Sequence, residues 1–557
     1  MTPTPPTPTG RRFIFAAAAV CLIVLAAQLA FVALDRTDQF NGYEHQVFDL
    51  LLAVAHDRPT AEFTVGLHRA PLDAGALLGL TAELVRLVGL HTWVLLVLPL
   101  LGWAAMLFFG YHTAVRLSGE PRAGWLAAAL LALCPFVFGV ARRFCPWTLI
   151  MGDYLAVIYL VIVLTDRPTL LHALLLGLAT ALGVFLPHEP TPLMLFLAHV
   201  TPPIAWGLLL VAISRNRRWP AKVLYVVVVL AIVGAALVFW EGRIRFYDPH
   251  YAGYVADEWI HVPRPHEEAS VWGYAPILAR NLIGLWGTVV VLAGFAAFPH
   301  FRRRPRDLFW FALPVALLVV MSVIPKKSPW YVMDFLPLAP ILAAVAIVGW
   351  LQNAGRRKTV AVTAAVYGGL LAQYVLMSFL AYFPAGTLRD WCNALTPYQN
   401  LAARPVSDDL SGGGPSFRAQ TDLFLAHFDE LFPARKEIRL GLMTEWMGYH
   451  MIPFYLRLSG RRLVLDDVLA HPAEEAGRLD GVVVITSYVP GGWWSRSLAD
   501  PRGLDDTVVR GYLEAHPWDA ARKARAHENA RRLLDELRDW RGVDLNAGVA
   551  VWRPRGP

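Results

Sequence analysis

A group of carboxylates follows the first apolar run of the chain. Asp35, Asp38, Glu44 and Asp49 lie within fifteen residues after the uncharged run 13–34. A carboxylate at the edge of an apolar phase is partly desolvated, which makes it a stronger base and suits it to take a proton in catalysis. An ordinary solvated loop with one or two helix caps explains the same residues, so spacing alone leaves both interpretations open.

A further acid, Asp153, lies inside the apolar run 147–165, which is about as long as a membrane-crossing helix. An acid at such a position is costly to bury, so a functional role is the first hypothesis. The structural alternative is an ion pair with Arg142 or Arg143, which precede the run.

Four cations, Arg142, Arg143, Lys326 and Lys327, stand beside apolar runs. Arginine binds a phosphate through two parallel hydrogen bonds, and lysine binds it as a point charge. The four residues therefore suit an anionic, phosphorylated ligand. Nonspecific contact with lipid headgroups is the alternative for each of them.

His188 and Glu189 stand between two prolines, where they form either a hydrogen-bonded turn or a contact to an acceptor or a metal. Further oxygen and nitrogen ligands occur at Glu44, His45, His68 and 266–268. No spacing such as His-Glu-x-x-His joins them, so a divalent metal ion is left open and no cofactor is certain.

Composition places these residues in a membrane protein. Of the 557 residues, 56% are apolar and only 17% are charged. Residues 384–557 carry 22 Lys/Arg and 23 Asp/Glu, nearly as many charges as the much longer stretch 1–383. We therefore predict a disordered cytoplasmic N-terminus (1–12), a polytopic helical membrane domain (13–383) and an external soluble α/β domain (384–557). The net charge of +7 fits loops held at a membrane face rather than nucleic acid.

Apolar periodicity predicts about eleven transmembrane helices. They are expected at 13–34, 92–115, 123–141, 147–165, 169–187, 192–213, 221–240, 276–298, 307–324, 331–350 and 359–383. The segment 71–90 is predicted to be an amphipathic helix along the interface. Sixteen Lys/Arg fall in alternate short loops, so the positive-inside rule puts the N-terminus in the cytoplasm and the tail outside. The long loops 35–91 and 241–275 then face outward.

Several motifs resemble the GT-C class of polytopic glycosyltransferases. Asn41-Gly42-Tyr43-Glu44-His45 stands where that class has an acidic pair after the first span. His68-Arg69-Ala70-Pro71-Leu72 resembles its His-x-Pro-Leu. The run 122–135 is similar to its Arg-x-Ala-Gly span, and Lys326 to Tyr331, with Pro337 and Pro340, to its late Lys-x-x-x-Tyr segment. The order of the motifs is most similar to the protein O-mannosyltransferase and lipid A aminoarabinose transferase group, which is glycosyltransferase family 39-like.

The resemblance implies transfer, with inversion, of a sugar from a polyprenyl-phosphate donor to an acceptor hydroxyl outside the bacterial cytoplasmic membrane. It implies Glu44 as the base with Asp38 behind it, and Asp153 as an orienting group. Arg142, Arg143, Lys326, Lys327, Tyr331, His68, His188 and Glu189 are the expected substrate-binding residues. The expected partners are the donor, a lipid, glycan or protein acceptor, and membrane lipids.

This sequence departs from the GT-C pattern where two acids are expected. Tyr43 replaces one of them, and Pro146-Trp147 stands where another is usual. A transporter of a lipid or amphiphile, or an inactive relative that serves as a scaffold in envelope assembly, therefore stays open as an alternative. A transporter is expected to show repeated, broken spans, and the sequence shows no such repeat.

Overall fold

The computed structural model describes two compact units. All described residues up to 379 belong to the first unit and all those from 417 onward to the second. The described residues are 18–27, 29, 76–141, 146–187, 190–214, 218–247, 273–279, 283–301, 305–323, 331–352, 354–379, 417–433, 437–444, 456, 459, 461, 463–467, 478–485, 520–546 and 549–554.

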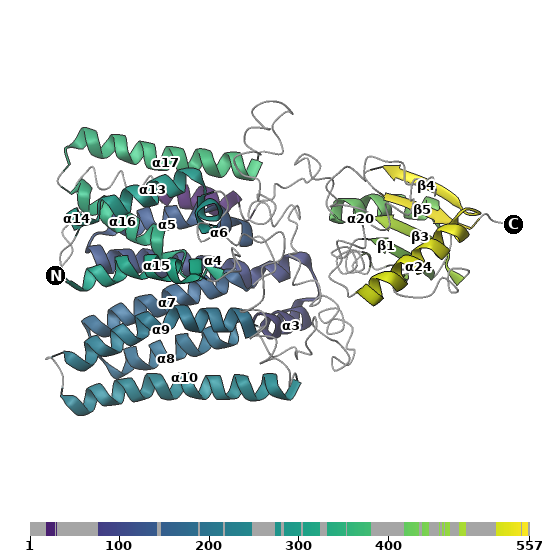
Figure 1. Ribbon diagram of the computed structural model, residues 1–557. Coiled ribbons are helices and arrows are strands. Elements are labelled where there is room, and N and C mark those ends of the chain that lie inside the picture. The colour runs from purple at the N-terminus through teal and green to yellow at the C-terminus, as the bar shows by residue number, and fades with distance from the viewer. Residues whose placement is uncertain are drawn as a thin grey trace. The chain divides into compact units, whose positions relative to one another are not determined.

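The first unit, called the membrane unit below, consists of helices (Figure 1). After a helical stretch at Ala18–Ala27, its helices are α3 (Ala76–Val88), α4 (Thr92–Ser118), α5 (Pro121–Ala132), α6 (Pro135–Val140), α7 (Trp147–Asp166), α8 (Leu170–Phe185), α9 (Pro190–Ile213), α10 (Trp219–Tyr247), α12 (Tyr274–Ile277), α13 (Leu285–Ala296), α14 (Phe298–Phe301), α15 (Pro305–Val323), α16 (Leu338–Leu351) and α17 (Arg356–Phe379).

Five of these helices, α4, α7, α9, α10 and α17, contain stretches long and apolar enough to cross a membrane, and five shorter apolar helices accompany them among the described residues. The predicted fold class, a polytopic helical protein with a C-terminal α/β unit, is confirmed. The number of eleven spans stays a prediction, and so do the domain boundaries.

Three predicted spans are interrupted. The span 123–141 is two helices, because Pro135 lacks an amide hydrogen and restricts Cys134 before it. The span 276–298 breaks at Gly284, whose φ of +79° favours glycine. The span 331–350 begins with a chain of turns at 331–337, and its helix α16 starts only after Pro337.

The short connections between successive helices show which helix ends lie together at each end of the membrane unit. α7, α8 and α9 follow one another closely and so alternate in direction, which brings the start of α7, the end of α8 and the start of α9 to one end. We call this the site end. The Thr148 hydroxyl donates to the Pro99 carbonyl at 2.7 Å, so the first turns of α4 lie there too.

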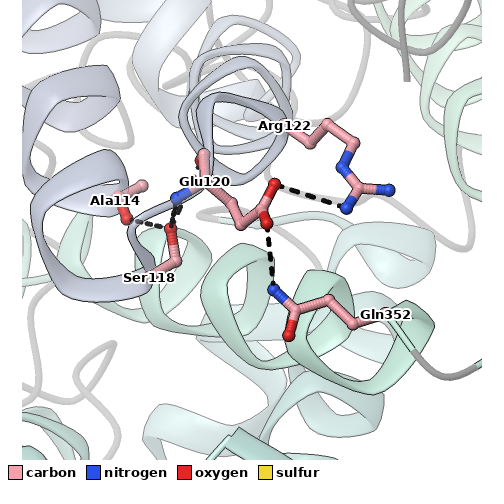
Figure 2. A network of polar contacts seen from close by, with 5 residues as sticks. All are labelled: Ala114, Ser118, Glu120, Arg122 and Gln352. Atoms are coloured by element: carbon pink, nitrogen blue, oxygen red, sulfur yellow. Dashed lines mark hydrogen bonds and ion pairs between the residues drawn. The ribbon is translucent and has the colours of Figure 1, made fainter. Parts of the chain in front are cut away.

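The opposite end is joined by a polar network around Glu120 (Figure 2). The Glu120 carboxylate accepts hydrogen bonds from Arg122 and from Gln352, each at 3.3 Å, while its amide donates to the Ser118 hydroxyl at 3.0 Å. Ser118 in turn donates to the Ala114 carbonyl. The network ties the connection between α4 and α5 to the end of α16.

The second unit contains a five-stranded sheet in the order β2-β1-β3-β5-β4. β2 and β3 run parallel to β1, while β5 is antiparallel to β3 and β4 is antiparallel to β5. Its elements are α20 (Phe417–Ala426), α21 (Phe428–Leu431), β1 (Ile438–Thr444), β2 (Leu463–Asp467), β3 (Gly481–Ile485), α24 (Ala520–Leu537), β4 (Arg541–Asn546) and β5 (Val549–Arg553). Every residue of β3 is buried, as expected for a central apolar strand.

Candidate active site

A close crossing of α4 and α7 sets the position of the predicted acid Asp153. A Cβ atom on Gly102 would lie 2.5 Å from the Leu149 amide nitrogen, and one on Gly152 would lie 2.8 Å from the Gly102 carbonyl oxygen. Two glycines thus let the two backbones touch one residue before Asp153.

Asp153 is buried between three helices. Its residue is 7% exposed. A Cβ atom on Gly183 of α8 would lie 2.4 Å from its Oδ2 atom and 2.0 Å from the Phe196 ring of α9. The Asp153 Oδ2 atom has no hydrogen-bond partner in the part of the chain that the structure describes. Asp153 is therefore a costly buried acid, as its place in the sequence predicts.

A buried histidine–carboxylate pair lies at the same end of the unit. Nδ1 of His199, in α9, lies 3.0 Å from Oδ2 of Asp334 in the turns before α16. The two side chains are 1% and 2% exposed. The Phe335 ring packs edge-on against the imidazole, with 4.8 Å between ring centroids. An ionised Asp334 requires the proton on Nδ1, which orients the ring and leaves Nε2 for another group.

Tyr154 adds a phenol to this pair. It follows Asp153 in α7, is fully buried, and interacts electrostatically with Asp334. Its hydroxyl and Nε2 of His199 both lack hydrogen-bond partners among the described residues. A carboxylate, an imidazole and a phenol from three separate segments thus gather at the site end.

Of the eleven predicted site residues, the structure describes two, Asp153 and Tyr331. Tyr331 is buried at the start of the turns that carry Asp334. The structure therefore puts both residues at the site end. The other nine lie outside the described residues: Asp38, Glu44, His68, Arg142, Arg143, His188, Glu189, Lys326 and Lys327.

No group of three or more His, Cys, Asp or Glu residues that could hold a metal ion occurs within the described ranges. The ligands considered from the sequence, Glu44, His45, His68, His188, Glu189 and 266–268, lie outside those ranges.

No family profile and no curated protein sequence matches the chain. Solved structures do match. ArnT from Cupriavidus metallidurans, bound to undecaprenyl phosphate, aligns with a TM-score of 0.53 and 16% identity over 80% of this chain and 85% of ArnT. This chain has the fold of the GT-C glycosyltransferases. At this identity the likeness establishes the architecture.

Two other GT-C structures align more weakly. The Archaeoglobus fulgidus oligosaccharyltransferase gives a TM-score of 0.45 at 13% identity, over 84% of this chain and 69% of that one. The mycobacterial arabinofuranosyltransferase AftD gives a TM-score of 0.43 at 14% identity, and the alignment covers 98% of this chain and 40% of the AftD chain.

The sequence-based prediction missed Tyr154, His199 and Asp334. His199 and Asp334 are single ionisable residues in predicted spans, and such residues are themselves a signal of function. What the sequence does not show is the pairing, since 135 positions separate the two.

Proposed function

We propose that this chain is a membrane glycosyltransferase that moves a sugar from a polyprenyl-phosphate donor to a hydroxyl group of an exported acceptor. The observation that carries the proposal is the buried carboxylate of Asp153, without a described partner, at one end of a helical bundle with the GT-C fold. The likeness to ArnT supports the lipid part of the donor, because the ArnT structure holds undecaprenyl phosphate.

The proposed reaction is a single displacement with inversion. Glu44, with Asp38 as the second candidate, takes the proton from the acceptor hydroxyl. The acceptor oxygen bonds to the anomeric carbon of the sugar, and the bond from that carbon to the phosphate oxygen breaks. The bonding electrons leave with the polyprenyl phosphate. Because this leaving group is already a phosphate, the reaction consumes no nucleotide. Asp153 orients or assists the reacting groups.

The cations of the outer loops bind the donor phosphate in this proposal. Arg142 and Arg143 stand a few residues before α7, the helix of Asp153, while Lys326 and Lys327 stand a few residues before the turns that carry Tyr331. Tyr331, His68, His188 and Glu189 complete the substrate contacts. A lipid, a glycan or a protein supplies the acceptor hydroxyl.

The proposed location is the bacterial cytoplasmic membrane. In this proposal the N-terminus 1–12 faces the cytoplasm, residues 13–383 form the membrane domain, and residues 384–557 form an external domain. The excess of Lys/Arg in alternate short loops supports this orientation.

Turnover by the purified full-length protein tests the proposal. Undecaprenyl phosphates that carry a pentose or a hexose are supplied as donors, octyl glucoside is supplied as the hydroxyl acceptor, and release of undecaprenyl phosphate is followed. We expect release by the wild type and a loss of about 100-fold or more in Glu44→Gln, the value for a removed acid–base group. Asp153→Asn is expected to lose activity as well.

Thr201→Val serves as the control variant. Thr201 lies in α9 like His199, and its exposed hydroxyl donates to the Leu197 carbonyl of its own helix. Unchanged turnover in both acid variants would refute the site. No turnover with any donor would favour the transporter or the scaffold.

A further inference from the structure

Three buried polar atoms lie at the site end. The proposed mechanism gives an orienting role to one of them and no role to the other two. They are Oδ2 of Asp153, Oη of Tyr154 and Nε2 of His199, and none has a hydrogen-bond partner among the described residues. Leaving such an atom unpaired costs about 1–3 kcal/mol. Each such atom calls for an explanation, and bound water, a ligand or a reacting group are among the common ones.

Two of these atoms belong to one cluster. Asp334 holds the imidazole of His199 through Nδ1 at 3.0 Å and interacts electrostatically with Tyr154. With Nδ1 committed to Asp334, Nε2 of a neutral His199 is a hydrogen-bond acceptor, while the Tyr154 hydroxyl both donates and accepts. The cluster therefore offers an acceptor and a donor to a third group.

The hydrogen-bonding capacity of these polar atoms narrows the chemistry of that group. An alkyl chain would leave the polar atoms unpaired. A neutral hydroxyl group fits, because it donates to the imidazole and accepts from the phenol.

Aromatic rings border the cluster, as they do in many pockets for small polar ligands. Phe335 packs edge-on against His199, and Phe196 lies one turn earlier on the same helix, against Gly183. Rings of this kind suit the C–H face of a sugar, while the polar atoms suit its hydroxyl groups.

We propose that Tyr154 and His199, with Asp334 as the residue that positions the imidazole, bind a hydroxyl group of a sugar. This inference rests on the proposed function and adds to it a site for the glycosyl group, separate from the phosphate-binding cations. The sugar belongs to the donor or to a glycan acceptor.

Binding to the full-length protein tests the inference without requiring turnover. Three probes are compared: undecaprenyl phosphate alone, the same lipid with a pentose or hexose attached, and octyl glucoside as an acceptor-like sugar. Tyr154→Phe removes only the hydroxyl. His199→Asn keeps a donor for Asp334 and removes Nε2.

For both variants we expect affinity for a sugar-bearing probe to fall about five- to tenfold, the effect of one lost hydrogen bond, with bare undecaprenyl phosphate unchanged. A loss confined to the glycosylated lipid assigns the site to the donor, and one confined to octyl glucoside assigns it to the acceptor. Tyr154→Phe is expected to keep or raise the melting temperature, because it removes an unpaired buried hydroxyl.

Tyr159→Phe is the matched control. Tyr159 lies in the same helix and packs against Phe109 and His112 instead. Equal losses for bare and glycosylated lipid, or no loss for any probe, would overturn the inference. A wild type that binds none of the three probes would instead refute the proposed function.

Discussion

Gly183 shows how one missing side chain shapes the site. Its Cα faces both the Asp153 carboxylate and the Phe196 ring, and an added Cβ would overlap both. We predict that Gly183→Ala lowers stability by about 1–3 kcal/mol, as overpacking of a core does, and displaces Asp153. Thermal unfolding in detergent and the turnover assay measure the two effects.

Gly234→Ala is the control for this substitution, since a Cβ at Gly234 of α10 meets nothing within 4 Å. Alanine favours a helix more than glycine does, so helix propensity alone should keep or raise the stability of both variants. An equal change of stability in both variants would show that the contact with Asp153 does not decide the effect.

A surface ion pair in the second unit predicts a response to pH. Arg461 bonds to both oxygens of Asp429, at 2.6 and 3.4 Å, and its guanidinium lies 4.3 Å above the Phe428 ring. The hydrogen bond from Arg461 lowers the pKa of Asp429 below its ordinary 3.8.

Because the folded pKa is depressed, the pair stabilises the folded state above pH 3.8 and loses that contribution as pH falls through the lowered value. We expect hydrogen exchange in α21 to increase over that range in the wild type. In Arg461→Met this acid-dependent step should be absent. A step of equal size in the variant would contradict the assignment.

At the scale of elements, the close contact between α4 and α7 sets the position of Asp153. Gly152→Ala would bring a Cβ to 2.8 Å from a backbone oxygen of Gly102, which cannot move as a side chain can. We predict a lower melting temperature together with lower activity, measured on the same preparation. Gly368→Ala, where the Cβ meets nothing within 4 Å, should leave both nearly unchanged.

Apolar periodicity predicts most helices of the membrane unit well, because every turn of a long apolar helix repeats the same signal. α7, expected at 147–165, is Trp147–Asp166, and α8, expected at 169–187, is Leu170–Phe185. The sequence stays apolar on both sides of Pro135 and Gly284, although the backbone at these residues interrupts the helix. Hydropathy therefore predicts one continuous span at each place where the structure has two helices.

The small sheet is predicted less completely. β3, Gly481–Ile485, is a continuous apolar run, and such a run by itself indicates a buried strand. β2 and β4 give no such signal, since Leu463–Asp467 and Arg541–Asn546 mix polar and apolar residues. Their strand structure depends on pairing with neighbours, which local sequence does not encode.

Asp153 and the His199–Asp334 pair show which parts of the site the sequence predicts and which it does not. Its burial follows from its place in an apolar run and was predicted. The pairing of His199 with Asp334 joins residues 135 positions apart and depends on how α9 packs against the turns before α16. Such a contact needs the three-dimensional structure.

At the scale of the whole molecule, the predicted orientation has a direct test. Alkaline phosphatase fused after residue 557 is expected to be active in a bacterial host, since that enzyme needs an oxidising exterior compartment. A fusion within the connection between α9 and α10, which contains Arg215, Arg217 and Arg218, should be inactive. The reverse pattern would place the site end in the cytoplasm.

The central claim is that the site end of the membrane unit receives the phosphate of a polyprenyl lipid. An experimental structure of the full-length protein with undecaprenyl phosphate tests it most directly. We predict phosphate density at the end where α7 begins, in contact with Arg142, Arg143, Lys326 or Lys327. Density at the opposite end, near Glu120 and Arg122, or no bound lipid at saturating concentration, would contradict the account.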